Sequence, residues 1–256
     1  MTGDHAVYRR VRPHGGEKNN PAAAGRREES PVKIGVVYTS TTPELTRMVD
    51  ASLAEAFGGE AGVEILNYQN PEILQMTRDS GRVTHKCARD LMDMYEAAVR
   101  DGANVLLNVC SSVGDVAAAA QPLYEMTGIP LVRIDEDMAR SAVRNARRIG
   151  VVATLSTTLE PTKRLLEACA RQEGVHVALV DALAEGVFGA DQETFKQKLI
   201  ETGRKVLGQV DVLLFAQGSM AYAEEAVSGA LGLPVYSSIR FGVRAVRAAT
   251  DALAEG

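Results

Sequence analysis

The residue best placed for chemistry in this chain is Cys110. It follows the apolar run 105–109, which has the character of a buried strand, and it precedes Ser111, Ser112 and a helical pattern that starts near Val113. A thiol at a strand-to-helix turn lies near the free N–H groups of the helix, which stabilise its thiolate form. The neighbouring hydroxyls and amides can hold a carboxylate. Although a free Cys is more often an inert buried residue, this context predicts a reactive thiol that acts on a small anion.

Other titratable side chains occupy less informative positions. The remaining two cysteines lie within helical patterns, where packing explains them, and His85 is a further candidate for a general acid. Arg78 and Arg82 belong to the polar segment 67–83, which is long enough to form a lid over a cleft. There, either side chain can hold a second carboxylate or remain solvated. No spacing of Cys, His and acidic residues matches a known metal motif and no P-loop occurs, so we predict neither a metal nor another cofactor.

The rest of the chain must position the thiol, and its pattern alternates strands with helices. Eight short apolar runs are predicted strands: 33–38, 63–66, 105–109, 131–134, 148–153, 176–180, 212–216 and 235–237. Amphipathic patterns between them predict helices, for example at 45–57, 84–100, 113–126 and 221–231. Strands that are apolar throughout are typical of parallel sheets buried on both faces. Alternation alone is compatible with open sheets and with a closed barrel.

An internal repeat decides between these architectures. Three segments reappear in the same order in the second half of the chain: 33–39 as 148–154, 105–112 as 212–219, and 129–132 as 233–236. The repeat predicts two pseudo-symmetric, three-layer α/β halves, residues 32–146 and 147–256, each with a mainly parallel four-stranded sheet. The carboxyl ends of the strands then surround a ligand cleft between the halves.

Composition sets the class of protein. A net charge of −5 argues against nucleic acid or an anionic membrane surface as the main partner. Apolar runs are strand-sized, much shorter than the ~20 residues of a membrane span. Three cysteines in a chain of this length do not make a disulfide framework and indicate reduced thiols in the cytoplasm. Residues 1–31 lack apolar periodicity and are predicted to be a disordered tail.

Within residues 32–256, segment 107–114 and its counterpart 216–220 resemble the aspartate/glutamate/hydantoin racemase superfamily. The resemblance implies a cofactor-independent enzyme in which two cysteines, one per half, act as acid and base on the α-carbon of a small carboxylic acid. Superfamily members often form dimers, so a homodimer is compatible with it. Cys110 matches the first of the two cysteines. The resemblance also implies substrate-binding residues in the strand-end loops: Thr39, Ser40, Asn108, Ser111, Ser112, Thr154, Thr157, Gly218 and Ser219.

The second catalytic position holds Gln217 where the superfamily has a cysteine. An amide does not transfer protons at useful rates, but it can hydrogen-bond an oxyanion. We therefore predict a single-thiol enzyme of the isomerase or lyase type, a racemase in family terms, with Cys110 as the chemical residue and Gln217 as an orienting residue. Two alternatives stay open. One is a non-catalytic protein that binds small carboxylates and has lost the second cysteine. The other is two-base racemisation in which Ser219 or His85 supplies the missing proton.

Overall fold

The computed structural model describes residues 9–11, 32–39, 42–58, 63–187 and 190–255. Its first sheet has the strand order β1-β3-β2-β4-β5. All neighbouring strands are parallel except β1, which pairs antiparallel with β3 at one edge. The strands are β1 (Arg9–Val11), β2 (Val32–Tyr38), β3 (Val63–Gln69), β4 (Val105–Asn108) and β5 (Leu131–Arg133).

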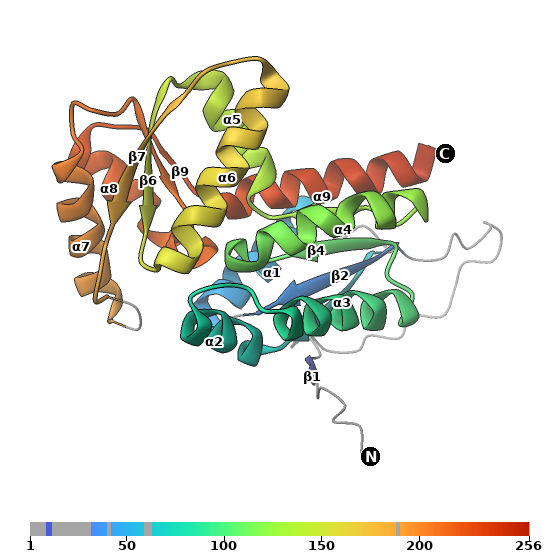
Figure 1. Ribbon diagram of the computed structural model, residues 1–256. Helices are drawn as coiled ribbons and strands as arrows, with labels where there is room; N and C mark the ends of the chain where they lie inside the picture. The colour runs from blue at the N-terminus through green and yellow to red at the C-terminus, as the bar shows by residue number, and fades with distance from the viewer. Residues whose placement is uncertain (1–8, 12–31, 40–41, 59–62, 188–189, 256) are drawn as a thin grey trace.

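The second sheet is parallel throughout and has the order β7-β6-β8-β9. Its strands are β6 (Arg148–Ala153), β7 (Ala178–Leu183), β8 (Val212–Phe215) and β9 (Val235–Tyr236). Leaving out β1, the two sheets have the same order of strands along the chain, which confirms the two-halved α/β architecture (Figure 1). The predicted strand at 176–180 is displaced, because β7 pairs with β6 only from Ala178 onward.

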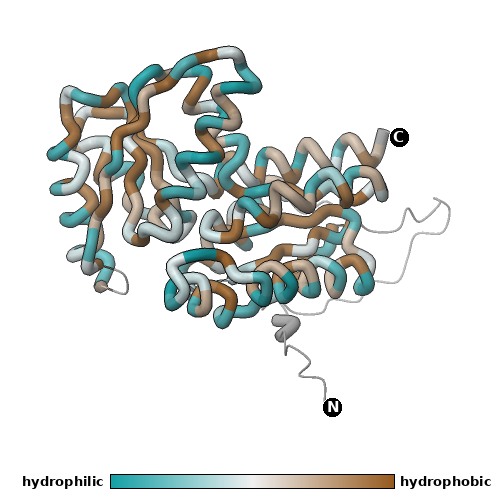
Figure 2. The backbone as a smooth tube through the Cα atoms, viewed as in Figure 1, coloured by the Kyte–Doolittle hydropathy of each residue, from teal (hydrophilic) through white to brown (hydrophobic). Residues whose placement is uncertain are grey.

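Helices cover both sheets, and the apolar residues concentrate along the strands between them (Figure 2). The helices of the first half are α1 (Pro43–Ala56), α2 (Pro71–Ser80), α3 (His85–Arg100), the 3₁₀ helix η1 (Ser111–Val113), α4 (Gly114–Met126) and α5 (Glu136–Asn145). Those of the second half are α6 (Ser156–Glu173), α7 (Gln192–Lys205), the 3₁₀ helix η2 (Gly218–Ala223), α8 (Glu224–Leu231) and α9 (Ser238–Glu255). No helix among the described residues is both long and apolar enough to cross a membrane.

The sequence repeat has a packing reason at its glycines. A Cβ atom at Gly35 in β2 would lie 2.8 Å from the Cβ atom of Ala98 on α3. A Cβ atom at Gly150, the matching position in β6, would lie 2.7 Å from the side chain of Leu213. Both distances are shorter than van der Waals contact, so each central strand needs a residue without a side chain there. The same packing requirement therefore recurs in both halves.

The last helix of each half packs on the other half. Met138, Ala142 and Val143 of α5 belong to the core built on the second sheet, together with α6. Conversely, Val243 and Val246 of α9 belong to the core of the first sheet, beside α1. Figure 1 shows α9 leaving the second half and extending over the first, where it packs against α1 and β4. The two halves are thus joined by an exchange of helices.

The exchange brings the two crossing segments into close contact. A Cβ atom at Gly242 in α9 would lie 2.8 Å from the Cα atom of Ile134, just after β5. Arg244 of α9 also donates to the carboxylate of Asp137 on α5, with Nη2 2.6 Å from Oδ2. The crossing is therefore held by backbone contact as well as by charge.

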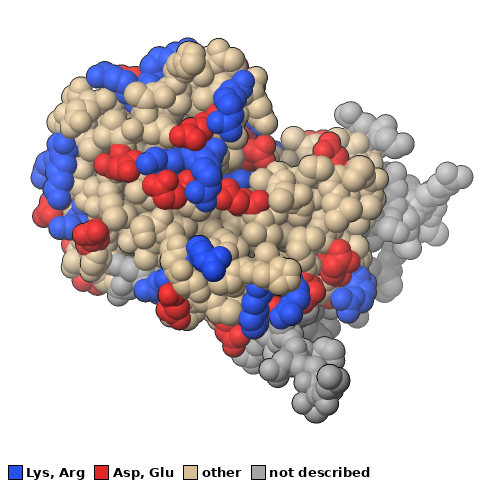
Figure 3. Space-filling view, viewed as in Figure 1, with Lys and Arg blue, Asp and Glu red and all other residues tan. Residues whose placement is uncertain are grey.

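The structure bears on two further expectations, for the N-terminal tail and for the segment 67–83. Of the N-terminal tail, only Arg9–Val11 is described, and it forms β1 against β3. The segment 67–83, expected to be a lid, contains α2, which Asn70 caps at its start and Gly81 ends with a φ of 64°. On the face shown in Figure 3, basic and acidic side chains are intermingled.

Candidate active site

Cys110 lies two residues after the end of β4, with an extended backbone, and caps the start of η1. The thiol is half-buried. Burial raises its pKa above the ordinary value, and the nearby carboxylate of Asp135 acts in the same direction. Thr39 and the backbone N–H groups of Val113 and Ser112 lower the pKa without cancelling the effect of burial. The thiol is therefore protonated near neutral pH.

The backbone of Cys110 is held from behind by a buried polar chain. Asn108 donates from Nδ2 to the carbonyl of Cys110 at 3.0 Å, and it accepts from the hydroxyl of Tyr95 at 2.9 Å. Both Asn108 and Tyr95 are buried. Asn108, expected to bind substrate, does not line the cavity described below, and its side chain instead fixes the strand end that carries the thiol.

The matching loop of the second half uses its polar side chain differently. Gln217 follows the end of β8, as Cys110 follows β4. Its Oε1 atom accepts from the backbone N–H of Thr154 at 2.8 Å, and its Nε2 atom donates to the hydroxyl of Thr154 at 2.7 Å. These bonds join the loops that follow β6 and β8. They leave one amide N–H of Gln217 for a ligand.

Cys110 and Gln217 line one cavity between the two halves, with a volume of about 50 Å³. Leu45 of α1 and Leu74 of α2 lie on its wall. The remaining lining residues are Val109, Ser111, Ser112, Leu155, Thr158, Gly218 and Ser219. Among the described residues that line this cavity, Cys110 has the only side chain that can titrate. Ligand pockets usually enclose about 300–1,000 Å³, so a carboxylic acid of several carbons enters only if the halves or α2 move.

Residues 34–246 match the Asp/Glu/Hydantoin racemase family. The chain belongs to this family. None of the functionally curated protein sequences matches it.

Solved structures of racemases share the fold of this protein. A glutamate racemase from Bacillus anthracis superposes with a TM-score of 0.64 at 15% identity, over 90% of this chain and 84% of that chain. An allantoin racemase from Klebsiella pneumoniae superposes with a TM-score of 0.62 at 18% identity, over 86% of this chain and 88% of that chain. For an aspartate racemase from Picrophilus torridus the TM-score is 0.60 at 14% identity, over 88% of this chain and 94% of that chain. These likenesses establish the fold, and their three different substrates select none for this chain.

One hydrogen bond beside the cavity joins the two halves directly. The hydroxyls of Ser112 on η1 and Thr158 on α6 are 2.8 Å apart and buried. Sequence reasoning placed Thr157 in the substrate loop, one position before Thr158, and missed the residue that reaches the cavity. Thr157 does not line the cavity. The periodicity of α6 is the signal that could have separated the two, because neighbouring residues on a helix point in different directions.

Two hydroxyls near the cleft have no partner. The side-chain oxygens of Ser111 and Thr157 are shielded from solvent and form no hydrogen bond with the described residues. A buried hydroxyl without a partner costs stability. Of the two residues, only Ser111 lines the cavity, so its hydroxyl is available to an anionic ligand. Thr39, expected to bind substrate, does not line the cavity and lies beside the thiol of Cys110. The hydroxyl of Ser238, also unpartnered, lies behind Gly218, where a Cβ atom would be 3.4 Å away. Ser40, expected to bind substrate, is outside the described residues.

The other predicted candidates lie away from the cavity. Arg78 on α2, and Arg82 and His85 near the start of α3, are exposed and do not line it. No cluster of three His, Cys, Asp or Glu side chains suited to a metal ion occurs among the described residues.

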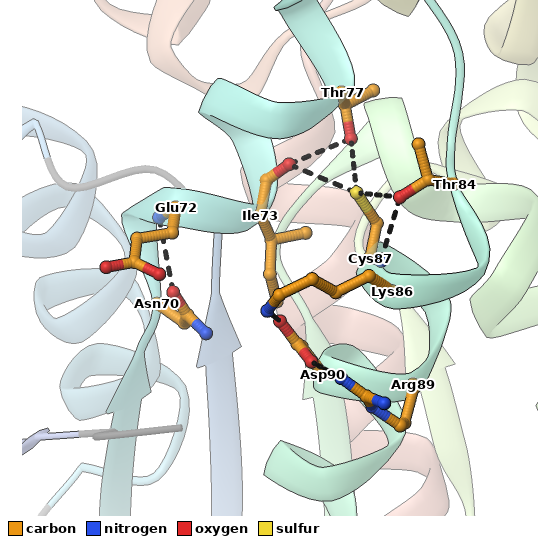
Figure 4. A network of polar contacts seen from close by, with 9 residues as sticks. All are labelled: Asn70, Glu72, Ile73, Thr77, Thr84, Lys86, Cys87, Arg89 and Asp90. Atoms are coloured by element: carbon orange, nitrogen blue, oxygen red, sulfur yellow. Dashed lines mark hydrogen bonds and ion pairs between the residues drawn. The ribbon is translucent and has the colours of Figure 1, made fainter. Parts of the chain in front are cut away.

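Cys87 has a structural environment of its own. Its buried thiol lies 3.1 Å from the hydroxyl of Thr84 and 3.6 Å from that of Thr77, so it joins α3 to α2 (Figure 4). Asp90, one turn further along α3, is paired with Lys86. Because α2 supplies Leu74 to the cavity, this network holds one wall of the site in place. It also explains why the predicted lid is an ordered helix.

Proposed function

We propose that this protein is a cofactor-independent enzyme of the isomerase or lyase type that acts on a small carboxylic acid through the single thiol of Cys110. The observation that carries the proposal is the lining of the cavity. Cys110 comes from one half and Gln217 from the other, and no second described lining residue has a side chain that titrates near neutral pH. Two-face racemisation needs an acid and a base on opposite sides of the substrate carbon.

The raised pKa of Cys110 favours a proton donor over a resting nucleophile. In a decarboxylation, the bond between the α-carbon and one carboxylate breaks, carbon dioxide leaves, and the electron pair stays on the α-carbon as an enediolate. The thiol of Cys110 then transfers its proton to that carbon. The resulting thiolate regains a proton from water, which balances the cycle. The same thiol can serve an isomerisation if its thiolate removes a proton from one carbon of the substrate and the resulting thiol returns a proton to a different carbon.

The surrounding groups suit the negative charge that develops in such a reaction. Ser111 and the backbone N–H groups of η1 lie beside the thiol, and Gln217 retains one free amide N–H. None of the described lining residues is a Lys or Arg. The carboxylate is therefore bound by neutral donors, which gain strength when the closed cavity excludes water.

The decisive experiment follows deuterium from solvent into product. Substituted malonates, aspartate, glutamate and hydantoins are incubated with the protein in D₂O and followed by NMR, with the C110A variant as control. We expect loss of carbon dioxide and one deuterium on the α-carbon of a malonate product. Deuterium exchange with racemisation of an amino acid would instead show a second acid. Ligand-induced thermal stabilisation that persists in C110A without any turnover by the wild type would show a binding protein.

Further expectations belong to this proposal. The three cysteines are unpaired, which suits a reducing compartment, and we assign the protein to the cytoplasm. We also expect a homodimer, as the family resemblance implies. Residues 1–31 are expected to contribute nothing to the reaction.

A further inference from the structure

A buried ion pair lies beneath the thiol and takes no part in the reaction described above. Arg133, the last residue of β5, donates from Nε and Nη2 to the two carboxylate oxygens of Asp135, at 3.0 and 3.2 Å. Each side chain is 2% exposed. Removing one partner of such a pair leaves an uncompensated charge in the interior.

The guanidinium of Arg133 is pressed against the turn that carries the thiol. A Cβ atom at Gly114 would lie 2.3 Å from Nη2 and 2.8 Å from Cζ of Arg133. Any other residue at Gly114 would collide with this group, so the guanidinium occupies the space beside the Gly114 backbone. Gly114 directly follows η1, whose N–H groups are directed at Cys110. The ion pair thus supports the segment that stabilises the thiolate.

The pair is also close enough to act on the thiol by charge. Asp135 raises the pKa of Cys110, and Arg133 lowers that of Tyr95, the residue behind the Cys110 backbone. Other charged or titratable groups act on the pair or share its surroundings from each neighbouring element: Asp115 on α4, Glu136 and Arg140 on α5, and Cys169 on α6. Asp115 is paired with Arg164, and Glu136 is paired with Arg140. Arg133 is therefore the cation that balances Asp135.

We propose that Arg133 and Asp135 form a positioning pair that supports the η1 turn and balances the charge beside Cys110. This inference deepens the proposed function, because it assigns the control of the same thiol. It rests on the buried bidentate contact, on the contact with Gly114 and on the closeness of both groups to the turn.

The pair is reachable from outside. Arg133 lines a groove of about 730 Å³ between α4 and α6, separate from the cavity at Cys110. A small guanidinium compound can therefore enter where the Arg133 side chain has been removed. This access makes a rescue experiment feasible.

The test compares R133A with D135N by the rate at which iodoacetamide alkylates Cys110, measured on the Cys110 peptide by mass spectrometry from pH 6 to 10. Removing the cation leaves Asp135 unbalanced, so alkylation at pH 7 should fall on the order of tenfold in R133A. Removing the anion leaves Arg133 unbalanced, so the rate should rise by a similar factor in D135N. A merely structural role would loosen the turn in both variants and shift both rates in the same direction.

Rescue and control variants complete the test. Ethylguanidinium chloride should restore the rate in R133A, whereas urea and sodium chloride at equal concentration should not. The exposed pair of Arg148 and Asp211, 2.6 Å apart, provides matched controls, and R148A and D211N should leave the rate unchanged. Rates that are unchanged, or shifted in one direction, in folded R133A and D135N would overturn the proposal. If R133A does not fold, a slower rate in D135N alone overturns it. Because alkylation does not depend on turnover, this outcome is independent of the proposed reaction.

Discussion

The loop after β4 and the loop after β8 occupy matching places in the two sheets and use them in opposite ways. In the first half, the side chain at the strand end is a thiol whose proton is free to react, and Asn108 and Tyr95 hold only its backbone. In the second half, the side chain of Gln217 is itself the link that ties two loops together through Thr154. The loop after β4 presents a reactive thiol to the cavity, whereas the loop after β8 holds the opposite side of the cavity in position.

This difference shows how a symmetric fold can support asymmetric chemistry. The duplicated sheets supply two equivalent positions, but only the position with an ionisable group can move a proton. Gln217 at the matching position already bonds Thr154 through its amide, so it contributes rigidity and one remaining hydrogen-bond donor. The following changes test this division of labour, from the largest expected effect to the smallest.

Replacing Cys110 by alanine should have the largest effect, because it removes the one titratable side chain among the described residues that line the cavity. We expect turnover to fall by about 10³- to 10⁴-fold, the upper range for general acid catalysis. Binding of the carboxylic acid, measured by calorimetry, should survive, because the hydroxyls and N–H groups remain. C169A, which removes a buried thiol from α6, serves as the control. Full activity in C110A would contradict the mechanism.

Replacing Gln217 by alanine should cost less, about 10²-fold in kcat, since one oxyanion donor is lost while the acid remains. The companion variant Q217C restores a thiol to the second position. It should introduce exchange of the α-proton of a bound amino or hydroxy acid with deuterium, measured by NMR. If Q217A proves as inactive as C110A, Gln217 has a chemical role and the two loops are more alike than their contacts indicate.

Replacing Thr158 by valine should lower the free energy of unfolding by about 1–3 kcal/mol, because the buried hydroxyl of Ser112 loses its partner. The measurement is urea unfolding followed by circular dichroism. T162V is a matched control on the same helix, because the hydroxyl of Thr162 donates to the carbonyl of Thr158 within that helix. Equal losses in the two variants would show that the contact between halves contributes nothing of its own.

Deleting residues 1–31 should have the smallest effect, less than about 1 kcal/mol, because a three-residue edge strand adds few contacts to a sheet. Thermal unfolding and the alkylation rate of Cys110 provide the measurements. A clear loss of stability would mean that β1 and the residues around it protect the edge of β3.

Much of this arrangement could be read from the residues. The repeat predicts both sheets because the same apolar strands and the same close packing at Gly35 and Gly150 are needed twice. The position of Cys110 follows from its place between a buried strand and a helix. The helix α2 was missed although Asn70, Pro71 and Gly81 mark its ends, because its polar composition outweighed these signals.

Other features have no local signature. The apolar stripe of α9 shows that the helix is buried, but it does not show which sheet covers it. The pairing of Arg133 with Asp135 likewise depends on the space left by Gly114, which is a property of the fold. The hydrogen bonds between Gln217 and Thr154 require the ends of β6 and β8 to lie side by side. The sequence alone does not show how far apart these two ends are.

The exchange of α5 and α9 has a consequence for how the polypeptide can be divided. A cut between residues 146 and 147 separates the two repeats, yet each fragment then carries the helix that seals the other. The first fragment keeps α5, whose Met138 and Val143 pack on the second sheet and so lose their partner. The second fragment keeps α9, whose Val243 and Val246 pack on the first sheet and likewise lose theirs. Each fragment alone would expose an open core and aggregate. Co-expressed, the two should recognise one another through these helices and reconstitute the molecule, which makes the protein a natural candidate for a split reporter.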